Sequence, residues 1–457
     1  MKQIEQERHI FADVLTSYLH LLKSQMKTYP IIHNTLTARL KANVTRIDKF
    51  LKAHNISAAE SDDKSSYSIP ANLMKQFIQL TEDIDHAVQA LQLTPRNLIV
   101  AFVSIYDSFI SDIIRAIYTI KPELLNSCAK EIPVTQVLRA ESIEVIKQQI
   151  IDKEAETVLR DSHLKQLKWL EGKLGISLTK DLPNLKHFIE ITERRNLYVH
   201  ANGKISEQYL ENCDPSFKTI KGNALHVGDV LHVSPAYVKH AYNILFEFGV
   251  KLCQVIWRKL ENHKSLEEVD DILIDIIYDL LKERDYKLAI IISEFATKNY
   301  VKSHNKVSEY VKCINKALAY YLNGDHEECK KVLETQDWSA SDLQFKLAVA
   351  VLDERYDNAY EYMREIGQKE KMKDSYREWP LFTNIRERDE FKKVYNDIYG
   401  EPYECIEIRP INWTDIIQES LELSKTIPPQ SESVESEKDL NNKSNGTGDE
   451  VGENSNP

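Results

Sequence analysis

Apolar residues recur at helical spacing through most of the chain. Near the N-terminus they fall at intervals of three and four residues, at Phe11, Val14, Leu15, Tyr18, Leu19 and Leu22, which predicts a helix. A second apolar run over residues 36–51 predicts another helix. Because proline interrupts the hydrogen bonds of a helix interior, residues 1–57 are expected to form a helical hairpin broken near Pro30. Residues 58–70, which are poor in apolar side chains, are expected to be a linker.

The most apolar predicted helix covers residues 97–120. Its apolar side chains lie on nearly every face, which predicts a central position in a helical bundle over residues 71–264. Asp107, Ser104 and Ser108 interrupt this helix, and a buried polar group needs a partner, so these residues are candidates for a functional role. Further helices are predicted near 141–160 and between Pro183 and Gly203, which are residue types that begin and end helices.

Residues 265–400 contain a weak internal repeat. Its marks are an aromatic residue or His followed three residues later by a small residue: Tyr286 and Ala289, His326 and Cys329, Tyr356 and Ala359. The spacing is near the tetratricopeptide period, and each pair is expected to open the second helix of a helical pair. Tyr320, Tyr356 and Tyr360 are expected on the repeat surface.

The end of the chain differs in composition from the rest. Residues 401–427 form a separate C-terminal segment, of which 403–413 are expected to be extended. Residues 428–457 are polar, acidic and free of aromatic residues, so a disordered tail is expected.

Composition favours an all-α protein in the cytoplasm. Only 12 of 457 residues are Gly, which argues against a hairpin-rich sheet protein. The six cysteines have no close spacing, so they are expected to be reduced thiols and not metal ligands. Neither a signal peptide nor a stretch of about 18 uncharged apolar residues is seen, so no membrane span is expected. The known motifs of nucleotide-binding loops, serine hydrolases and zinc proteases are missing from the sequence, so no cofactor is expected.

The net charge of −12 speaks against a surface coated for nonspecific nucleic-acid binding. The charge is unevenly distributed, however. Residues 428–457 contain seven acids and two bases, a charge of −5, whereas residues 180–265 contain twelve bases and nine acids, a charge of +3. The locally basic segment is the one that holds the candidate site.

That site is the segment ERRNLYVHANG, with Arg195, Asn196 and His200. Asn196 and His200 are one turn apart on one helical face, whereas Arg195 lies about 140° around an ideal helix from His200. Leu197 and Val199 are expected to face inward. One chain cannot readily bring Arg195 and His200 to the same phosphate, but two such helices can do so across the axis of a symmetric dimer.

The spacing between Arg195 and His200 is weak evidence by itself. Arg258 and His263 have the same spacing, and they are interpreted as part of a solvated helix face. Arg195 and His200 could also be cations that stabilise the last turn of a helix, with Gly203 as its cap.

The residue types nevertheless suit RNA cleavage without a metal ion. That reaction needs a base for the ribose 2′-hydroxyl, an acid for the departing 5′-oxygen and a fixed positive charge beside the phosphate. Histidine can serve the first two roles and arginine the third. Asn196 would orient the imidazole or the phosphate.

Four segments together resemble the HEPN superfamily of helical ribonucleases over residues 85–260. They are FVSIYDSFISDIIRAIY, the helix containing Trp169, the Arg-Asn-x3-His helix and NGKISEQYL. The resemblance implies a metal-independent, often dimeric ribonuclease of toxin, abortive-infection or antiviral systems. It implies that Arg195 and His200 are catalytic, with Asn196 as the polar residue after the arginine and Asp107 as the acid of the preceding core helix.

The resulting expectation is a homodimeric endoribonuclease that cuts RNA and is regulated through residues 265–400. The source of the restraint is left open between a regulatory protein partner bound to these residues, a phage product and the chain's own termini. The alternative is a noncatalytic helical adaptor that recruits another protein through the repeats. A DNA-binding regulator is disfavoured by the net charge and by the lack of a recognisable helix-turn-helix.

Overall fold

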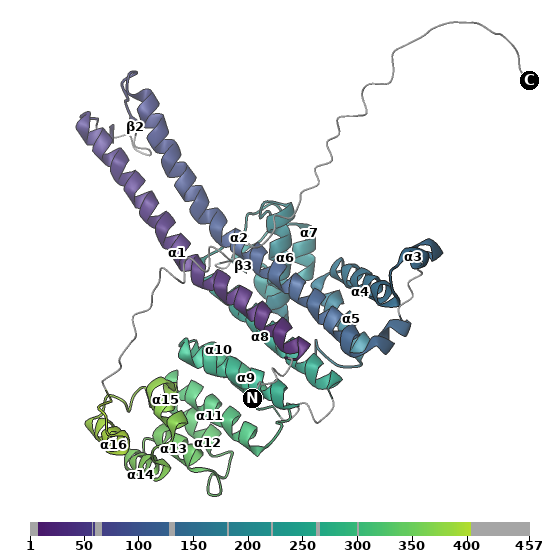
Figure 1. Cartoon of the computed structure of the whole chain (residues 1–457). Coiled ribbons are helices and arrows are strands. Elements are labelled where there is room, and N and C mark those ends of the chain that lie inside the picture. Colours follow the sequence, from purple (N-terminus) through teal and green to yellow (C-terminus); the bar gives the residue numbers. More distant parts are fainter. Residues whose placement is uncertain are drawn as a thin grey trace, which may run out of the picture. The chain divides into compact units, whose positions relative to one another are not determined.

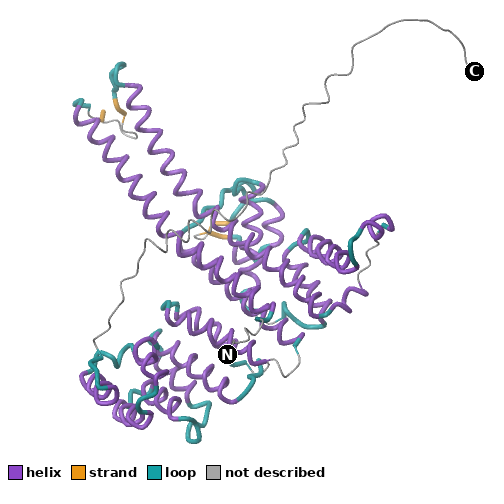
Figure 2. Tube along the Cα trace, viewed as in Figure 1, coloured by secondary structure: helices purple, strands orange, loops and turns teal. Residues whose placement is uncertain are grey.

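The computed structural model of the chain describes residues 8–56, 58–59, 66–127, 133–180, 182–220, 223–261, 266–298 and 301–403. The fold is all-α, as predicted: helices make up most of the described chain, and the strands are short (Figure 2). Met1–Gly400 forms one compact unit, which contains both the predicted bundle and the predicted repeats. Glu401–Pro457 is assigned to a separate unit.

Two long helices, α1 (Ile10–Ala53) and α2 (Met74–Ile120), lie side by side (Figure 1). The segment between them, expected to be a linker, contains a small hairpin in which β1 (Ala58–Ala59) pairs with β2 (Ser66–Tyr67). The apolar residues predicted to share a face of α1 are buried, apart from the half-buried Val14. They pack against α2 and α8 (Pro235–Leu260).

The predicted break at Pro30 is wrong, because α1 continues through this residue as a single 44-residue helix. Pro30 is exposed, so water can reach the carbonyl group that proline leaves without its helical hydrogen bond. Packing of α1 along α2 stabilises the helix on both sides of the proline. Helix α1 is therefore one arm of a helical pair, and α2 is the other.

Helix α2 is the centre of the bundle, as its apolar pattern predicted. It contacts α1, α4, α6 and α8. The helices around it are α4 (Ile143–Leu159), α5 (His163–Leu174), α6 (Leu185–His200) and α8. Shorter elements connect them: η1 (Pro122–Ser127), α3 (Val134–Arg139), α7 (Glu207–Asn212), η2 (Pro215–Phe217), and the paired strands β3 (Thr219–Ile220) and β4 (Asn223–Ala224). The helices predicted near 141–160 and between Pro183 and Gly203 are confirmed as α4 and α6.

One expectation about α2 needs correction. This helix contains an 18-residue stretch that is long and apolar enough to cross a membrane. A stretch of this kind tolerates one or two charged residues, which a search for wholly uncharged runs overlooks. Of this stretch, 56% is buried inside the protein, as in the core helix of a soluble protein.

The region after α8 is built of helical pairs: α9 (Leu266–Lys282) with α10 (Tyr286–Ala296), α11 (Lys306–Leu322) with α12 (His326–Leu333), and α13 (Leu343–Leu352) with α14 (Tyr356–Ile366). Tyr286, His326 and Tyr356 each begin the second helix of a pair, which confirms the predicted positions. The small residues three positions later are buried. The helices α15 (Glu370–Glu378), η4 (Pro380–Phe382) and α16 (Asp389–Tyr399) complete the region.

Two expectations concern the end of the chain. The extended segment predicted within 401–427 and the disordered tail predicted over 428–457 lie outside the described residues, except for residues 401–403.

Close packing of α1 on α8 gives a sharp test of the fold. A Cβ atom added at Gly249 of α8 would lie 2.1 Å from Cε1 of Tyr18. The hydroxyl group of Tyr18 donates a 2.7 Å hydrogen bond to the carbonyl of Leu245, so its ring cannot easily move. We expect Gly249→Ala to lower the free energy of unfolding by about 1–3 kcal/mol, measured by urea denaturation.

The matched control is Gly172→Ala. Gly172 is exposed within α5, and an added Cβ would meet nothing within 4 Å. Alanine there should stabilise the helix by up to about 1 kcal/mol. Equal stability of Gly249→Ala and the wild type would contradict the described contact between α1 and α8.

Candidate functional site

The candidate site lies where α6 crosses the exposed side of α2. One carboxylate oxygen of Asp107, on α2, forms an ion pair with the guanidinium group of Arg195, on α6. Arg195 also donates a 3.1 Å hydrogen bond from Nη1 to the side-chain oxygen of Asn196. The structure therefore brings together three of the four residues that the sequence singled out, although 88 positions separate Asp107 from Arg195.

A residue that the sequence did not single out completes this cluster. Nε2 of His163, the first residue of α5, lies 2.8 Å from the other oxygen of Asp107. The His163 ring packs edge-on against Phe188, with 6.0 Å between the ring centroids. No local sequence signal marks His163, because it is brought to Asp107 only by the packing of α5 on α2 and α6.

Exposure separates the members of the cluster. The side chain of His163 is 9% exposed, whereas those of Arg195 and Asp107 are 20% and 26% exposed. Solvent therefore reaches the Asp107–Arg195 pair and hardly reaches His163. Nε of Arg195 is buried and has no hydrogen-bond partner within the described part of the chain. Nη1 and Nη2 of Arg195 each use one of their two N–H bonds in the described contacts, so the other N–H bonds could bind an anion.

His200 lies apart from this ion-pair cluster. It is the last residue of α6, its side chain is exposed, and it has no hydrogen bond or ion pair to any described residue. Asn196, one turn earlier, is half-buried. The structure thus places an anchored arginine and a free imidazole at different positions around the end of one helix.

The inward direction predicted for Val199 is wrong, because this residue is 49% exposed. Leu197 is buried as expected. Two residues that are two positions apart point about 200° apart on a helix, so they cannot both face one core. Ser104 and Ser108 of α2 are also exposed. Because water can bind their hydroxyl groups, they need no hydrogen-bond partner inside the protein.

The end of α6 is held by a compact turn. Gly203 has a φ of +81°, and its N–H donates to the carbonyl of Leu197 at 2.9 Å. The guanidinium of Arg96, on α2, lies over the Tyr198 ring and donates a 2.8 Å hydrogen bond to the side chain of Asn202. A side chain at Gly203 would press on the Tyr198 ring at 3.2 Å. These contacts fix the backbone just beyond His200.

A buried polar network supports α6 from its other side. Glu190 is 1% exposed, and its carboxylate accepts hydrogen bonds from Arg194 at 2.7 Å, Tyr209 at 2.7 Å and Tyr237 at 2.5 Å. The Arg194 guanidinium also stacks on the Tyr237 ring, 4.0 Å from its centroid. Of the two adjacent arginines, Arg194 is therefore structural, and Arg195 is the one that reaches the candidate site.

Two histidines meet near the start of α6. Nδ1 of His187 and Nε2 of His240, on α8, are 3.0 Å apart. Burial lowers the pKa of both rings. The charge of Lys186 lowers the pKa of His187 further, and His187 does the same to His240. Both rings are therefore neutral in the folded protein at pH 7.

Acid should weaken the fold at this histidine pair. A lowered pKa means that the unfolded chain binds protons more readily, so stability falls as the pH drops below about 6.5, the ordinary value for histidine. We expect the melting temperature of the wild type to fall more between pH 8 and pH 5.5 than that of His240→Gln. Parallel falls in the two proteins would show that this pair does not couple protonation to folding.

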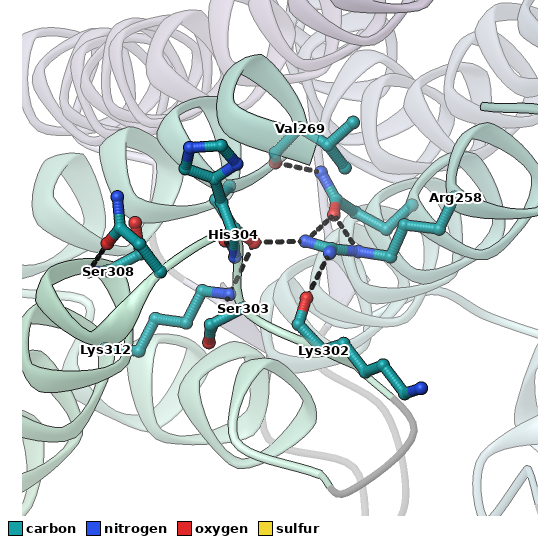
Figure 3. Close-up of polar contacts among 10 residues, drawn as sticks. Arg258, Val269, Lys302, Ser303, His304, Ser308 and Lys312 are labelled. Atoms are coloured by element: carbon teal, nitrogen blue, oxygen red, sulfur yellow. Dashed lines mark hydrogen bonds and ion pairs between the residues drawn. The ribbon is translucent and has the colours of Figure 1, made fainter. Parts of the chain in front are cut away.

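The Arg258 and His263 pattern was expected on a solvated helix face, and this is wrong for Arg258. Its side chain is only 11% exposed. Nη2 donates to Asp270 at 2.6 Å, and Nη1 donates to the carbonyl of Lys302 at 2.8 Å (Figure 3). The side-chain oxygen of Gln254 also accepts from this guanidinium. Packing of α9 and the loop before α11 on α8 encloses Arg258, whereas His263 lies outside the described residues.

Comparisons with known proteins add nothing to these observations. No family model matches the chain, and neither a curated protein nor a solved structure matches it. The resemblance to the HEPN superfamily therefore stands on the sequence motif alone.

Proposed function

We propose that the protein is a metal-independent endoribonuclease of the HEPN type, which works as a homodimer in the cytoplasm within a toxin or anti-phage defence system. One observation carries the proposal. The ion pair with Asp107 anchors Arg195 on α6, while His200 projects free into solvent at the end of the same helix. A fixed cation and an unpaired imidazole are the two kinds of group that cleavage of a phosphodiester needs.

In the proposed reaction the ribose 2′-oxygen attacks the adjacent phosphorus. The new bond from the 2′-oxygen to phosphorus forms as the bond from phosphorus to the 5′-oxygen breaks. A neutral His200 takes the proton of the 2′-hydroxyl, and a protonated His200 gives a proton to the departing 5′-oxygen. The products are a 2′,3′-cyclic phosphate and a 5′-hydroxyl, and Arg195 stabilises the extra negative charge that develops on the phosphate oxygens.

Two copies of the chain would supply the two histidines. Arg195 and His200 point in different directions around α6, so a single chain cannot close both on one phosphate. A two-fold axis beside the end of α6 would place two His200 side chains and two Arg195 side chains along one groove. Asp107 and Asn196 would then be positioning residues, because both contact Arg195.

A noncatalytic adaptor is the competing proposal. In this proposal the Asp107–Arg195 ion pair is purely structural, because it compensates two charged side chains where α6 packs on α2. The helical pairs of residues 265–400 would bind the partner. The expected repeat surface is smaller than the sequence indicated, because Tyr360 is only 7% exposed. Tyr320 and Tyr356 are half-buried, and they remain the residues to substitute in a test of partner binding.

The deciding experiment incubates purified full-length protein with total cellular RNA in EDTA and maps the RNA ends. The endoribonuclease proposal predicts cleavage in EDTA that leaves 2′,3′-cyclic phosphate and 5′-hydroxyl ends. Cleavage that needs added Mg²⁺, or that leaves 5′-phosphate ends, would contradict this mechanism. Intact RNA would favour the adaptor, especially if Tyr320→Ala or Tyr356→Ala abolished the biological effect.

A further inference from the structure

A cavity of about 650 Å³ opens between the helical pairs of the repeat region, and its lining is strongly basic. It lies among the end of α10, the following loop, the first half of α11 and the end of α12. Five lysines line it: Lys298, Lys302, Lys306, Lys312 and Lys316. Among the described lining residues, Glu309 is the one acid.

Lys312 sets this cavity apart from an ordinary solvated lysine surface. Its residue exposure is 1%, and a lysine is almost never buried so deeply without a compensating partner. Its ammonium group donates to Asp270 and to the hydroxyl of Ser303, the latter at 3.2 Å. Lysine has three N–H bonds, so one remains without a partner among the described contacts.

The partner of Lys312 is shared. Figure 3 shows Arg258 and Lys312 reaching from two sides into one polar network, and both form ion pairs with Asp270. The other oxygen of Asp270 accepts from the backbone N–H of His304 at 2.5 Å. Two cations thus share one carboxylate, which leaves an excess positive charge inside the fold. Such a charge is costly unless an anion lies nearby.

The other lysines bring more charge than the surrounding acids offset. Lys298 and Lys302 are exposed, and neither ammonium group has a hydrogen bond or ion pair to a described residue. Lys306 donates to Glu309 at 3.1 Å and to the side chain of Gln336 at 2.8 Å. Within the described part of the chain, Lys316 donates to a neutral partner alone, the Thr297 hydroxyl, at 3.3 Å. The cavity therefore faces solvent with several uncompensated ammonium groups.

We propose that this lysine-lined cavity binds a small anion that carries several phosphoryl groups, such as a nucleoside triphosphate or an inorganic polyphosphate chain. A cavity of this volume suits a small ligand. The charge of several lysines distributed around the cavity suits several phosphates, for which lysine acts as a point charge. The net charge of −12 makes this basic cavity a local feature of the protein.

The test measures binding of sodium tripolyphosphate and of ATP by isothermal titration calorimetry, at 0.15 M KCl and without Mg²⁺. The full-length protein is compared with Lys298→Glu/Lys302→Glu. These two side chains have no described partners, so reversing their charges should leave the fold intact. The control is Lys330→Glu/Lys371→Glu, which makes the same change of charge at exposed positions of α12 and α15 outside the lining.

We expect tripolyphosphate to bind the wild type and the control alike, and to bind the Lys298/Lys302 variant roughly ten-fold more weakly or worse. Tighter binding of ATP than of tripolyphosphate would show that the nucleoside contributes. No binding of either anion to the wild type would overturn the proposal, as would an equal loss in the control variant. The outcome does not depend on RNA cleavage, so this proposal and the proposed function can fail separately.

Discussion

His200→Ala should abolish RNA cleavage and leave the stability of the protein unchanged. Removing a general acid or base typically costs about 10²–10⁴-fold in rate, and in the proposed dimer the substitution removes both proton-transfer groups at once. The side chain is exposed and makes no polar contact with a described residue, so its loss should not disturb α6. The measurement is the initial rate of RNA cleavage, with thermal unfolding of the same samples.

The matched control is His232→Ala. His232 is another exposed histidine of the same locally basic segment, and it too has no described polar contact. The His232→Ala variant should cleave RNA at the wild-type rate. Retention of activity by His200→Ala, or equal losses in the two variants, would remove the basis for assigning the chemistry to the end of α6.

Arg195→Ala should lose activity as well, although its interpretation is less direct. Arg195 is bonded to Asp107 and Asn196, so removing it also leaves Asp107 with His163 alone. This difference in surroundings is the reason that His200, and not Arg195, gives the cleaner test of catalysis.

Local patterns in the sequence predicted the helices well. The apolar positions of α1, the central place of α2 and the ends of α6 follow from spacing and from capping residues, because these signals act within a few turns of chain. The starts of α10, α12 and α14 were predicted from an equally local cue, a small residue three positions into each helix. The predicted helix break at Pro30 was wrong because the packing of α1 on α2 stabilises the helix on both sides of the proline.

The candidate site could be predicted only in part. Arg195, Asn196 and His200 belong to one short motif, and Asp107 was noticeable as an acid in an apolar helix. The contact of His163 with Asp107 depends on how α5 packs, which no local pattern encodes. Arg258 shows the same limit of local patterns, because a residue predicted to be exposed is buried by distant parts of the chain. Its spacing from His263 looked like a surface feature, and only the docking of α9 and the loop before α11 encloses it.

The network around Arg258 leads to the largest expected effect on stability. Asp270 is fully buried and is the carboxylate shared by Arg258 and Lys312. Asp270→Asn keeps the size of the side chain and removes its charge, which leaves two buried cations without an anion. Removing one partner of a buried ion pair costs about 3–5 kcal/mol. We expect a loss of this size in the free energy of unfolding, measured by urea denaturation followed by circular dichroism.

Two comparisons show whether charge is the cause. Asp271→Asn makes the same chemical change at the neighbouring residue, which is exposed. Partial burial and nearby acids raise the pKa of this carboxylate, so the loss of its charge removes no net stabilising interaction. We therefore expect Asp271→Asn to change the free energy of unfolding by less than about 0.5 kcal/mol. Lys312→Met removes the excess cation and leaves Arg258 paired with Asp270. Burial lowers the pKa of Lys312 although its hydrogen bond to Asp270 acts in the opposite direction, so the charged ammonium is held there at a cost. Lys312→Met should therefore be much less destabilising than Asp270→Asn, and the reverse order would show that the network is not limited by its unbalanced charge.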